Sequence, residues 1–195
     1  GGIEVYQEHL YTEACARVLR QAIAAVPAGA APTVLLTTVP DEIHGLGLLM
    51  VEALLALHGA RCINLGTQMP LMDIARAARA YRADVVALSF SSAFATRRIP
   101  ELLRQLREAL PSGVELWAGG AAVRRLAPVA GVRLLPGLED EATRPEALRG
   151  IAAHVEAVGP MEQVAVGARG YALDYAGVTR VGDRPAIRLL SRVSW

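Results

Sequence analysis

Apolar and polar positions alternate with two different periods along the chain, and the first segment has the period of a helix. Its apolar residues recur every four or five positions, which predicts a helix from Ile3 to about Val26. Proline and glycine between positions 27 and 32 end it. Beyond this break, apolar runs predict strands at 34–38, 62–65, 84–89, 115–118 and 132–135, and amphipathic segments predict helices at 47–58, 71–82, 99–110, 121–126 and 141–155.

This order of elements predicts an α/β fold. Strands joined through helices form βαβ units with a parallel sheet, and strands that are apolar along most of their length suit a sheet covered on both faces. We therefore predict a five-stranded parallel, flavodoxin-like (Rossmann-like) sheet of order 2-1-3-4-5. Ligands of such sheets bind outside the carboxyl ends of the strands, so the loops after the first, third and fourth strands are the candidate site.

The two ends of the chain differ from this central part. Residues 32–155 are expected to form the main domain, and residues 1–28 a separate helical segment. Glycines punctuate short β-type runs near the end of the chain, so we interpret residues 156–195 as a tail with a small β hairpin. The chain starts at Gly1-Gly2, without an initiator Met and directly in a helical pattern, and we expect an upstream part to be missing.

Composition and charge exclude a few classes of protein. Hydrophobic residues make up 53% and charged residues 20%, which predicts a folded chain. A net charge of +1 argues against a nucleic-acid-binding surface spread over the whole chain. Without a bilayer-length apolar run or a signal peptide's apolar stretch, we expect a cytoplasmic protein with no membrane partner. Cys15 and Cys62 lie among core-type residues, and we interpret them as small buried hydrophobes.

The loop after the first predicted strand contains Glu42-x-His44-x-x-Gly47. Imidazole is a ligand for cobalt, iron, zinc or copper. A carboxylate two residues away can accept the other ring N–H, which fixes the tautomer and raises the basicity of the ligand. Glycine lets the backbone pass close to a flat ligand. The alternative is a loop histidine that only caps a helix.

The loops after the third and fourth predicted strands carry hydroxyls and glycines. Ser89 and Ser91 suit hydrogen bonds to a heterocycle beside the sheet, although either can instead cap the next turn. Gly119 and Gly120 leave room for a ligand's tail and offer N–H groups to a phosphate, although a plain tight turn is the alternative.

Together these three loops resemble the cobalamin-binding signature, which is Asp/Glu-x-His-x-x-Gly, then Ser-x-Leu or a serine-containing variant, then Gly-Gly. The signature occurs in methionine synthase, corrinoid methyltransferase proteins and mutases. The resemblance implies that cobalamin binds with His44 as the lower ligand of the cobalt. It implies contacts with the cofactor from Glu42, Gly47, Ser89, Ser91, Gly119 and Gly120, and from Thr67 at the corrin's edge, where a plain loop threonine is an equal alternative.

One subgroup matches further, namely the light-sensing MerR-type transcriptional regulators of the CarH/LitR kind. In that family a Trp…Glu-His motif lies in a helical bundle over the upper face of the corrin. The pair Glu8-His9 resembles its Glu-His end, and the Trp would fall before Gly1. The resemblance implies that residues 1–28 are the C-terminal part of such a bundle, with Glu8 and His9 near the cofactor; a solvated helix face is the alternative. The segment Leu65-Gly66…Pro70-Leu71…Asp73 is similar to the same subgroup.

The resemblance therefore implies the cobalamin-binding sensor portion of a MerR-type regulator, not an enzyme. Its expected cofactor is adenosylcobalamin, whose cobalt–carbon bond light breaks. Its expected partners are DNA, through a helix-turn-helix domain absent from this chain, and further copies of itself in a homo-oligomer. Two alternatives remain, namely a corrinoid carrier subunit for methyl transfer and a regulator module that has lost cobalamin binding.

Overall fold

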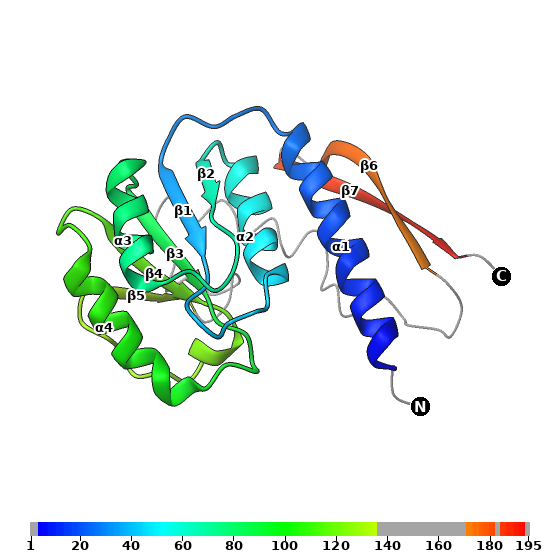
Figure 1. The fold of residues 1–195 in the computed structure, drawn as a ribbon. Coiled ribbons are helices and arrows are strands. Elements are labelled where there is room, and N and C mark those ends of the chain that lie inside the picture. Colours follow the sequence, from blue (N-terminus) through cyan, green and yellow to red (C-terminus); the bar gives the residue numbers. More distant parts are fainter. Residues whose placement is uncertain (1–3, 136–170, 182–183, 194–195) are drawn as a thin grey trace.

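The computed structural model of the protein describes residues 4–135, 171–181 and 184–193 (Figure 1). Its helices are α1 (Val5–Ala25), α2 (Leu46–Leu57), α3 (Leu71–Ala80) and α4 (Ile99–Ala109), with 3₁₀ turns η1 (Thr96–Arg98) and η2 (Ala121–Val123). Its strands are β1 (Thr33–Thr37), β2 (Arg61–Asn64), β3 (Val85–Ser89), β4 (Glu115–Gly119), β5 (Val132–Leu135), β6 (Tyr171–Val181) and β7 (Arg184–Val193).

Strands β1 to β5 form one parallel sheet of order β2-β1-β3-β4-β5, which confirms the predicted order. Every residue of β1 is buried, as expected for a strand covered on both faces. Since all five strands run in the same direction, their carboxyl ends share one edge of the sheet. The loops after β1, β3 and β4 therefore meet at that edge.

Helices cover both faces of the sheet. Because alternate strand residues point to opposite sides, neighbouring residues of β1 belong to different core clusters. On one face Leu35 packs in a core cluster with Ile74 of α3 and Leu103 of α4. On the other face Leu36 packs in a second cluster with Leu55 of α2. Leu36 and Leu55 on this second face also line an apolar cavity of the candidate site.

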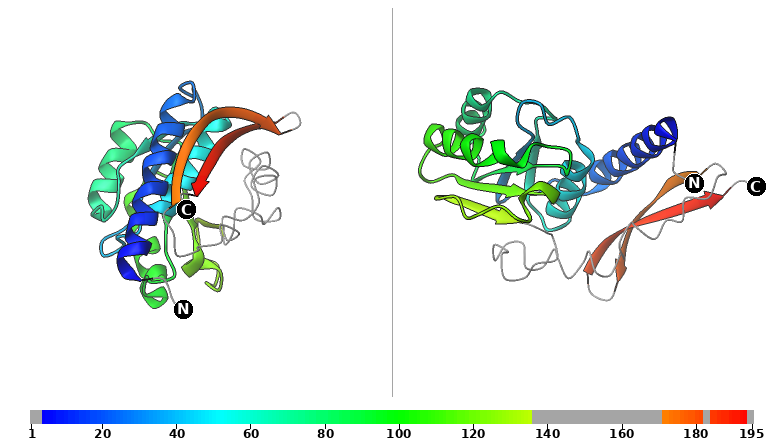
Figure 2. Two further views of the ribbon diagram at one scale, coloured as in Figure 1. Left: turned by 90° about the vertical axis from the view of Figure 1, so that its right-hand side faces the viewer. Right: turned by 90° about the horizontal axis from the view of Figure 1, so that it is seen from below.

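Helix α1, which confirms the predicted N-terminal helix, packs on α2 and on strand β6 (Figures 1 and 2). The two strands near the end of the chain, β6 and β7, form an antiparallel hairpin with a register shift between Tyr175 and Gly177. A hairpin was predicted here, and the observed strands are longer than the apolar runs that predicted it. The buried side chains of α1 are Cys15, Ala16, Val18 and Ala22.

The predicted helix at 121–126 is wrong, because the segment forms only the turn η2. Its hydrogen bonds run from Val123 N to Gly120 O and from Leu126 N to Val123 O, both of the i to i−3 type. Pro128 follows, and proline disfavours helical geometry in the residue before it, so no full α-helical turn forms. The predicted helix at 141–155 lies outside the described residues.

Within the described ranges, no helix is both long and apolar enough to cross a bilayer.

Candidate functional site

Two buried threonines tie the loop after β1 to the loop after β2. Thr37 Oγ1 donates to the carbonyl of Gly66 at 2.9 Å. Thr38 Oγ1 accepts from the backbone N–H of Gln68 at 2.9 Å and donates to the carbonyl of Glu42 at 2.6 Å. Both threonines are fully buried, so the chain's path to Glu42 is fixed from inside the protein.

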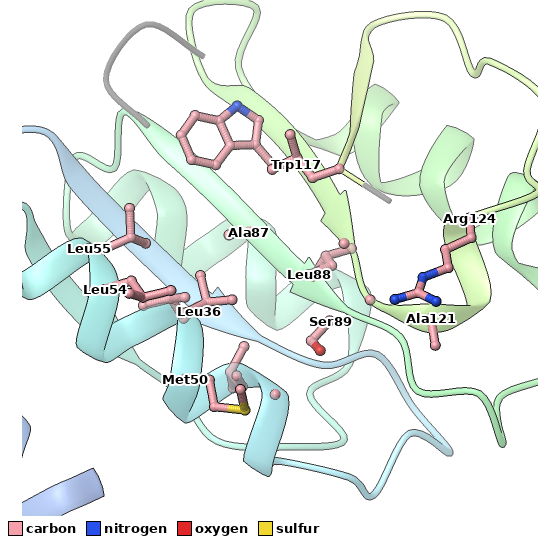
Figure 3. A pocket seen from close by; sticks show the side chains of 16 residues that line it. Leu36, Met50, Leu54, Leu55, Ala87, Leu88, Ser89, Trp117, Ala121 and Arg124 are labelled. Carbon is pink, nitrogen blue, oxygen red and sulfur yellow. The ribbon is translucent and has the colours of Figure 1, made fainter. Parts of the chain in front are cut away.

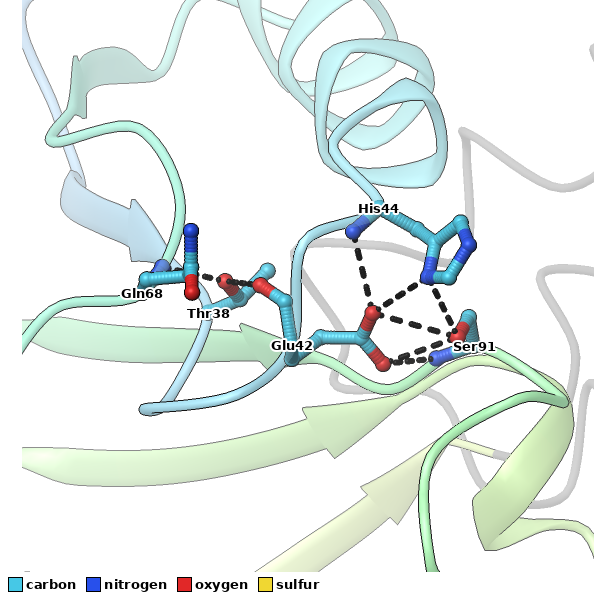
Figure 4. A network of polar contacts seen from close by, with 5 residues as sticks. All are labelled: Thr38, Glu42, His44, Gln68 and Ser91. Atoms are coloured by element: carbon cyan, nitrogen blue, oxygen red, sulfur yellow. Dashed lines mark hydrogen bonds and ion pairs between the residues drawn. The ribbon is translucent and has the colours of Figure 1, made fainter.

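The carboxylate of Glu42 lies at the centre of a polar network that joins the loops after β1 and β3 (Figure 4). Its Oε1 lies 2.8 Å from His44 Nδ1 and accepts from the His44 backbone N–H at 3.0 Å. Its Oε2 accepts from the backbone N–H and the hydroxyl of Ser91 at 2.8 and 2.9 Å. The sequence therefore predicted the Glu42–His44 pairing correctly, and the structure adds Ser91 as a third member.

Electrostatics favours the ionised form of Glu42, although only 1% of its surface is exposed. Burial by itself raises the pKa of this carboxyl, but the hydrogen bonds donated by the backbone and side chains of His44 and Ser91 outweigh it and lower the pKa overall. An ionised carboxylate is only an acceptor, so it holds His44 as the tautomer with the proton on Nδ1. The second ring nitrogen then points away from the network (Figure 4), and the side chain of His44 is 54% exposed.

A cavity of about 900 Å³ lies between α1 and the loops after β1 and β2. His44 and Thr67 line it from the sheet side, and His9 lines it from α1. A Cβ at Gly45 would lie 3.1 Å from Thr67 Cγ2, so glycine keeps this wall open. Glu8 lies in α1, and its side chain falls outside the described residues. The other residues lining the cavity are Thr12, Glu13, Ala16, Arg20, Ile43, Leu46, Leu48, Leu49, Glu52, Asn64 and Gly66.

A second, apolar cavity of about 190 Å³ lies along the α2 face of the sheet, and we call it the groove (Figure 3). Ser89, Gly119 and Gly120 line it at the carboxyl ends of β3 and β4. Gly47 lines it from the first turn of α2, where a Cβ would lie 3.3 Å from Ser89 Oγ. Leu48 lines both this groove and the large cavity, so the two hollows are neighbours.

Gly120 also has a structural role, at the tight turn that follows β4. Its φ is +99°, and a Cβ there would lie 2.3 Å from the carbonyl oxygen of Phe90, so the backbone itself requires glycine. At the same turn the N–H groups of Ala122 and Val123 donate to Phe90 O and Gly120 O, so these two are not available to a phosphate. Gly119 is less constrained, since its Cβ would lie 3.4 Å from the nearest atom.

Ser89, the last residue of β3, and Ser91, two residues later, have different surroundings. Ser89 lines the groove, whereas Ser91 bonds Glu42 and does not line it. Among the groove residues that the sequence did not predict, Trp117 of β4 and Arg124 after η2 carry polar side-chain atoms. Their signal was position alone, because Trp117 lies within β4 and Arg124 follows the turn after it.

These features fit a flat cofactor with a metal at its centre and a heterocyclic tail. A broad cavity lies beside a half-exposed imidazole whose Nδ1 is held by a carboxylate. An apolar groove kept open at Gly47 lies next to it. Among the described residues no group of three or more His, Cys, Asp or Glu gathers to hold a metal ion. A corrinoid carries its own metal, so the protein needs to supply one imidazole ligand and space for the cofactor's tail.

The family model of the B12 binding domain matches residues 32–129, and the chain belongs to this family. The match spans the region of β1, β3 and β4 with their loops, from which the candidate site is built.

The chain is also 36% identical over 124 residues to the HTH-type transcriptional repressor CarH of Myxococcus xanthus. The match covers 64% of this chain and 42% of the repressor, so the chain spans less than half of that relative's length.

Two solved structures are similar in fold. A cobalamin-binding protein from Desulfitobacterium hafniense DCB-2 is 20% identical, with a TM-score of 0.40 over 56% of this chain and 57% of that one. The monomethylamine corrinoid protein of Methanosarcina barkeri is 23% identical, with a TM-score of 0.42 over 57% of this chain and 52% of that one.

Proposed function

We propose that this chain is the cobalamin-binding sensor portion of a transcriptional regulator, with His44 as the lower ligand of cobalt. The observation that carries the proposal is the 2.8 Å contact between His44 Nδ1 and Glu42, with His44 lining a broad cavity that adjoins an apolar groove at Leu48. The corrin occupies the broad cavity, and the displaced base of the cofactor occupies the groove. Ser89 donates a hydrogen bond to that base, Gly119 and Gly120 border it, and Thr67 contacts the edge of the corrin.

Each residue of the network has a separate task in this proposal. His44 offers Nε2 to cobalt because Glu42 holds the proton on Nδ1, and the buried carboxylate increases the basicity of the imidazole. Ser91 donates two hydrogen bonds to the carboxylate of Glu42 and keeps that carboxylate turned toward the imidazole ring. When bound, the cofactor supplies a cobalt centre that carries an exchangeable upper group.

The upper face belongs to α1. His9 lines the broad cavity from this helix, opposite the side that carries His44. We assign to Glu8 a contact with the ribose of an adenosyl group, and to His9 a place beside it or a role as an alternative ligand once that group has left. A sensor needs such polar groups above the cobalt, because it reads the identity of the upper group.

Regulation follows as a shift of populations. The cofactor can act only through its different affinity for two arrangements of α1 over the sheet. In our proposal adenosylcobalamin holds one arrangement, light breaks the cobalt–carbon bond, and the helical segment then shifts. The full-length protein would be a MerR-type, cytoplasmic homo-oligomer that contacts DNA through a helix-turn-helix domain outside this chain, in line with the sequence similarity to CarH.

A visible spectrum tests the central assignment. Purified protein is titrated with adenosylcobalamin in the dark, and the spectrum should show imidazole in place of the cofactor's own base. His44→Ala should lose this spectrum and bind more weakly, whereas His58→Ala, at the end of α2 and away from both cavities, should keep it. An unchanged spectrum and affinity in His44→Ala would show that another group is the lower ligand.

A further inference from the structure

The groove offers few polar side-chain atoms to a buried ligand. Only Ser89, Trp117 and Arg124 carry them among its lining residues. The Trp117 N–H already donates to Glu115 Oε2 at 2.7 Å, and Arg124, at an exposed position, has donors and no acceptor. Among the residues that line the groove, the hydroxyl of Ser89 is therefore the one side-chain group that can both donate to and accept from a ring. The other walls are aliphatic or backbone, with Leu36, Leu55 and Leu135 among them.

We propose that this groove selects the lower base of the corrinoid by polarity, preferring a benzimidazole to a purine. The inference rests on the proposed binding mode, in which His44 replaces that base on cobalt. A dimethylbenzimidazole released from cobalt presents a single ring nitrogen that accepts a hydrogen bond, and its methyl groups are apolar. The hydroxyl of Ser89 then donates to the ring nitrogen, and the aliphatic walls pack against the methyl groups of the base.

Adenine is the informative contrast, because it is also a bicyclic ring and differs little in size. It brings an exocyclic amino group and further ring nitrogens. In the same groove the amino group would lose water and find no acceptor on the aliphatic wall or on Arg124. Each unpaired group weakens binding, so the adenine form should bind at least about tenfold more weakly than the benzimidazole form.

The experiment compares three corrinoids that share an adenosyl upper group, each titrated into the protein in the dark. These are cobalamin, the corresponding cobamide with adenine as its base, and cobinamide, which has no nucleotide. We expect cobalamin to bind at least about tenfold more tightly than either of the others. Ser89→Ala should weaken the binding of cobalamin and leave the binding of cobinamide unchanged.

A second variant tests the aliphatic wall directly. Val51 lines the groove, and Val51→Thr adds a hydroxyl there with little change in shape. It should narrow the preference for cobalamin over the adenine form. The matched control is Val129→Thr, since Val129 packs against the core on the opposite face and lines neither cavity.

The outcomes separate this inference from the binding mode itself. Equal affinities for cobalamin and the adenine form overturn the selectivity. Equal affinities for cobalamin and cobinamide mean that the groove is not used, and they overturn it as well, with the His44 spectrum still intact. If no corrinoid binds, the proposed function fails and the selectivity fails with it.

Discussion

At Glu42 the cost of burying a charge is met by several hydrogen bonds that converge on two oxygens. The backbone N–H groups of His44 and Ser91 donate one to each oxygen, and the serine hydroxyl and the imidazole complete the set. Both oxygens of a carboxylate accept hydrogen bonds, whereas the NH₂ group of an amide donates them, so an amide cannot replace the carboxylate here. The position therefore discriminates between a carboxylate and an amide of the same shape.

Glu42→Gln tests this discrimination. The amide NH₂ would face N–H donors, so we expect a loss of about 1–3 kcal/mol in the free energy of unfolding of the cofactor-free protein. The His44 spectrum should weaken as well, because the ring loses its orienting acceptor. Urea denaturation and the visible titration measure the two effects. Glu108→Gln, at an exposed carboxylate of α4, is the control and should change neither.

Glycines of the site require glycine for two different reasons, and substitution separates them. Gly47→Ala places a Cβ 3.3 Å from Ser89 Oγ in the wall of the groove, so cobalamin affinity should fall while the fold persists. Gly120→Ala places a Cβ 2.3 Å from a carbonyl oxygen at φ +99°, so the fold itself should lose stability. Gly113→Ala meets nothing within 4 Å and is the control. Thermal unfolding and cobalamin titration of all three variants measure the two effects. A Gly120→Ala variant that lost cobalamin affinity without losing stability would contradict this scheme.

At the scale of elements, the hydrophobic pattern was sufficient to predict the sheet. Nearly continuous apolar runs marked β1 to β5, and their alternation with helices fixed the parallel order. The same pattern failed at 121–126, where helical residues are stopped after one 3₁₀ turn by a downstream proline and by bonds to Phe90. Contacts between distant segments, such as the bond from Ser91 to Glu42, have no periodic signal, so the separate tasks of Ser89 and Ser91 became visible only in three dimensions.

Helix α1 offers a chemical reporter of its own docking. Cys15 lies on its buried side, and burial raises the pKa of that thiol. Burial, with the charge of Glu52 nearby, raises the pKa of Cys62 to about 12, which leaves roughly one thiolate in ten thousand at about pH 8. Both cysteines should therefore react slowly with iodoacetamide in the folded protein.

Cobalamin should slow the reaction of Cys15 further, because α1 forms a wall of the cavity in which we propose that the cofactor binds. The measurement is the alkylation rate of Cys15 in a Cys62→Ser variant, with and without cobalamin. Cys62 in a Cys15→Ser variant is the matched control, since it lies on β2, and its rate should change less. Equal protection of both thiols would mean that the cofactor stabilises the whole fold and does not act through α1.

For the molecule as a whole, two separate parts of the chain enclose one cavity. The sheet domain contributes His44 and Thr67, and α1 contributes His9. In our proposal a corrinoid in this cavity would have its lower face against the sheet domain and its upper face toward the helix. In the proposed binding mode the sheet domain would determine whether a corrinoid binds, and α1 would determine which upper group it carries.

This division distinguishes a sensor from a carrier of methyl groups. A sensor should bind adenosylcobalamin more tightly than methylcobalamin, because polar groups of α1 contact the larger upper group, whereas a carrier needs that face open to its partner enzymes. Glu8→Ala and His9→Ala should each reduce the preference, and Arg17→Ala, at an exposed position of α1 that lines neither cavity, should keep it. Dissociation constants for both cofactors, measured in the dark, decide the question. If the unsubstituted protein binds the two forms equally, α1 does not read the upper group, and a methyl carrier becomes the better account of the same His44 site.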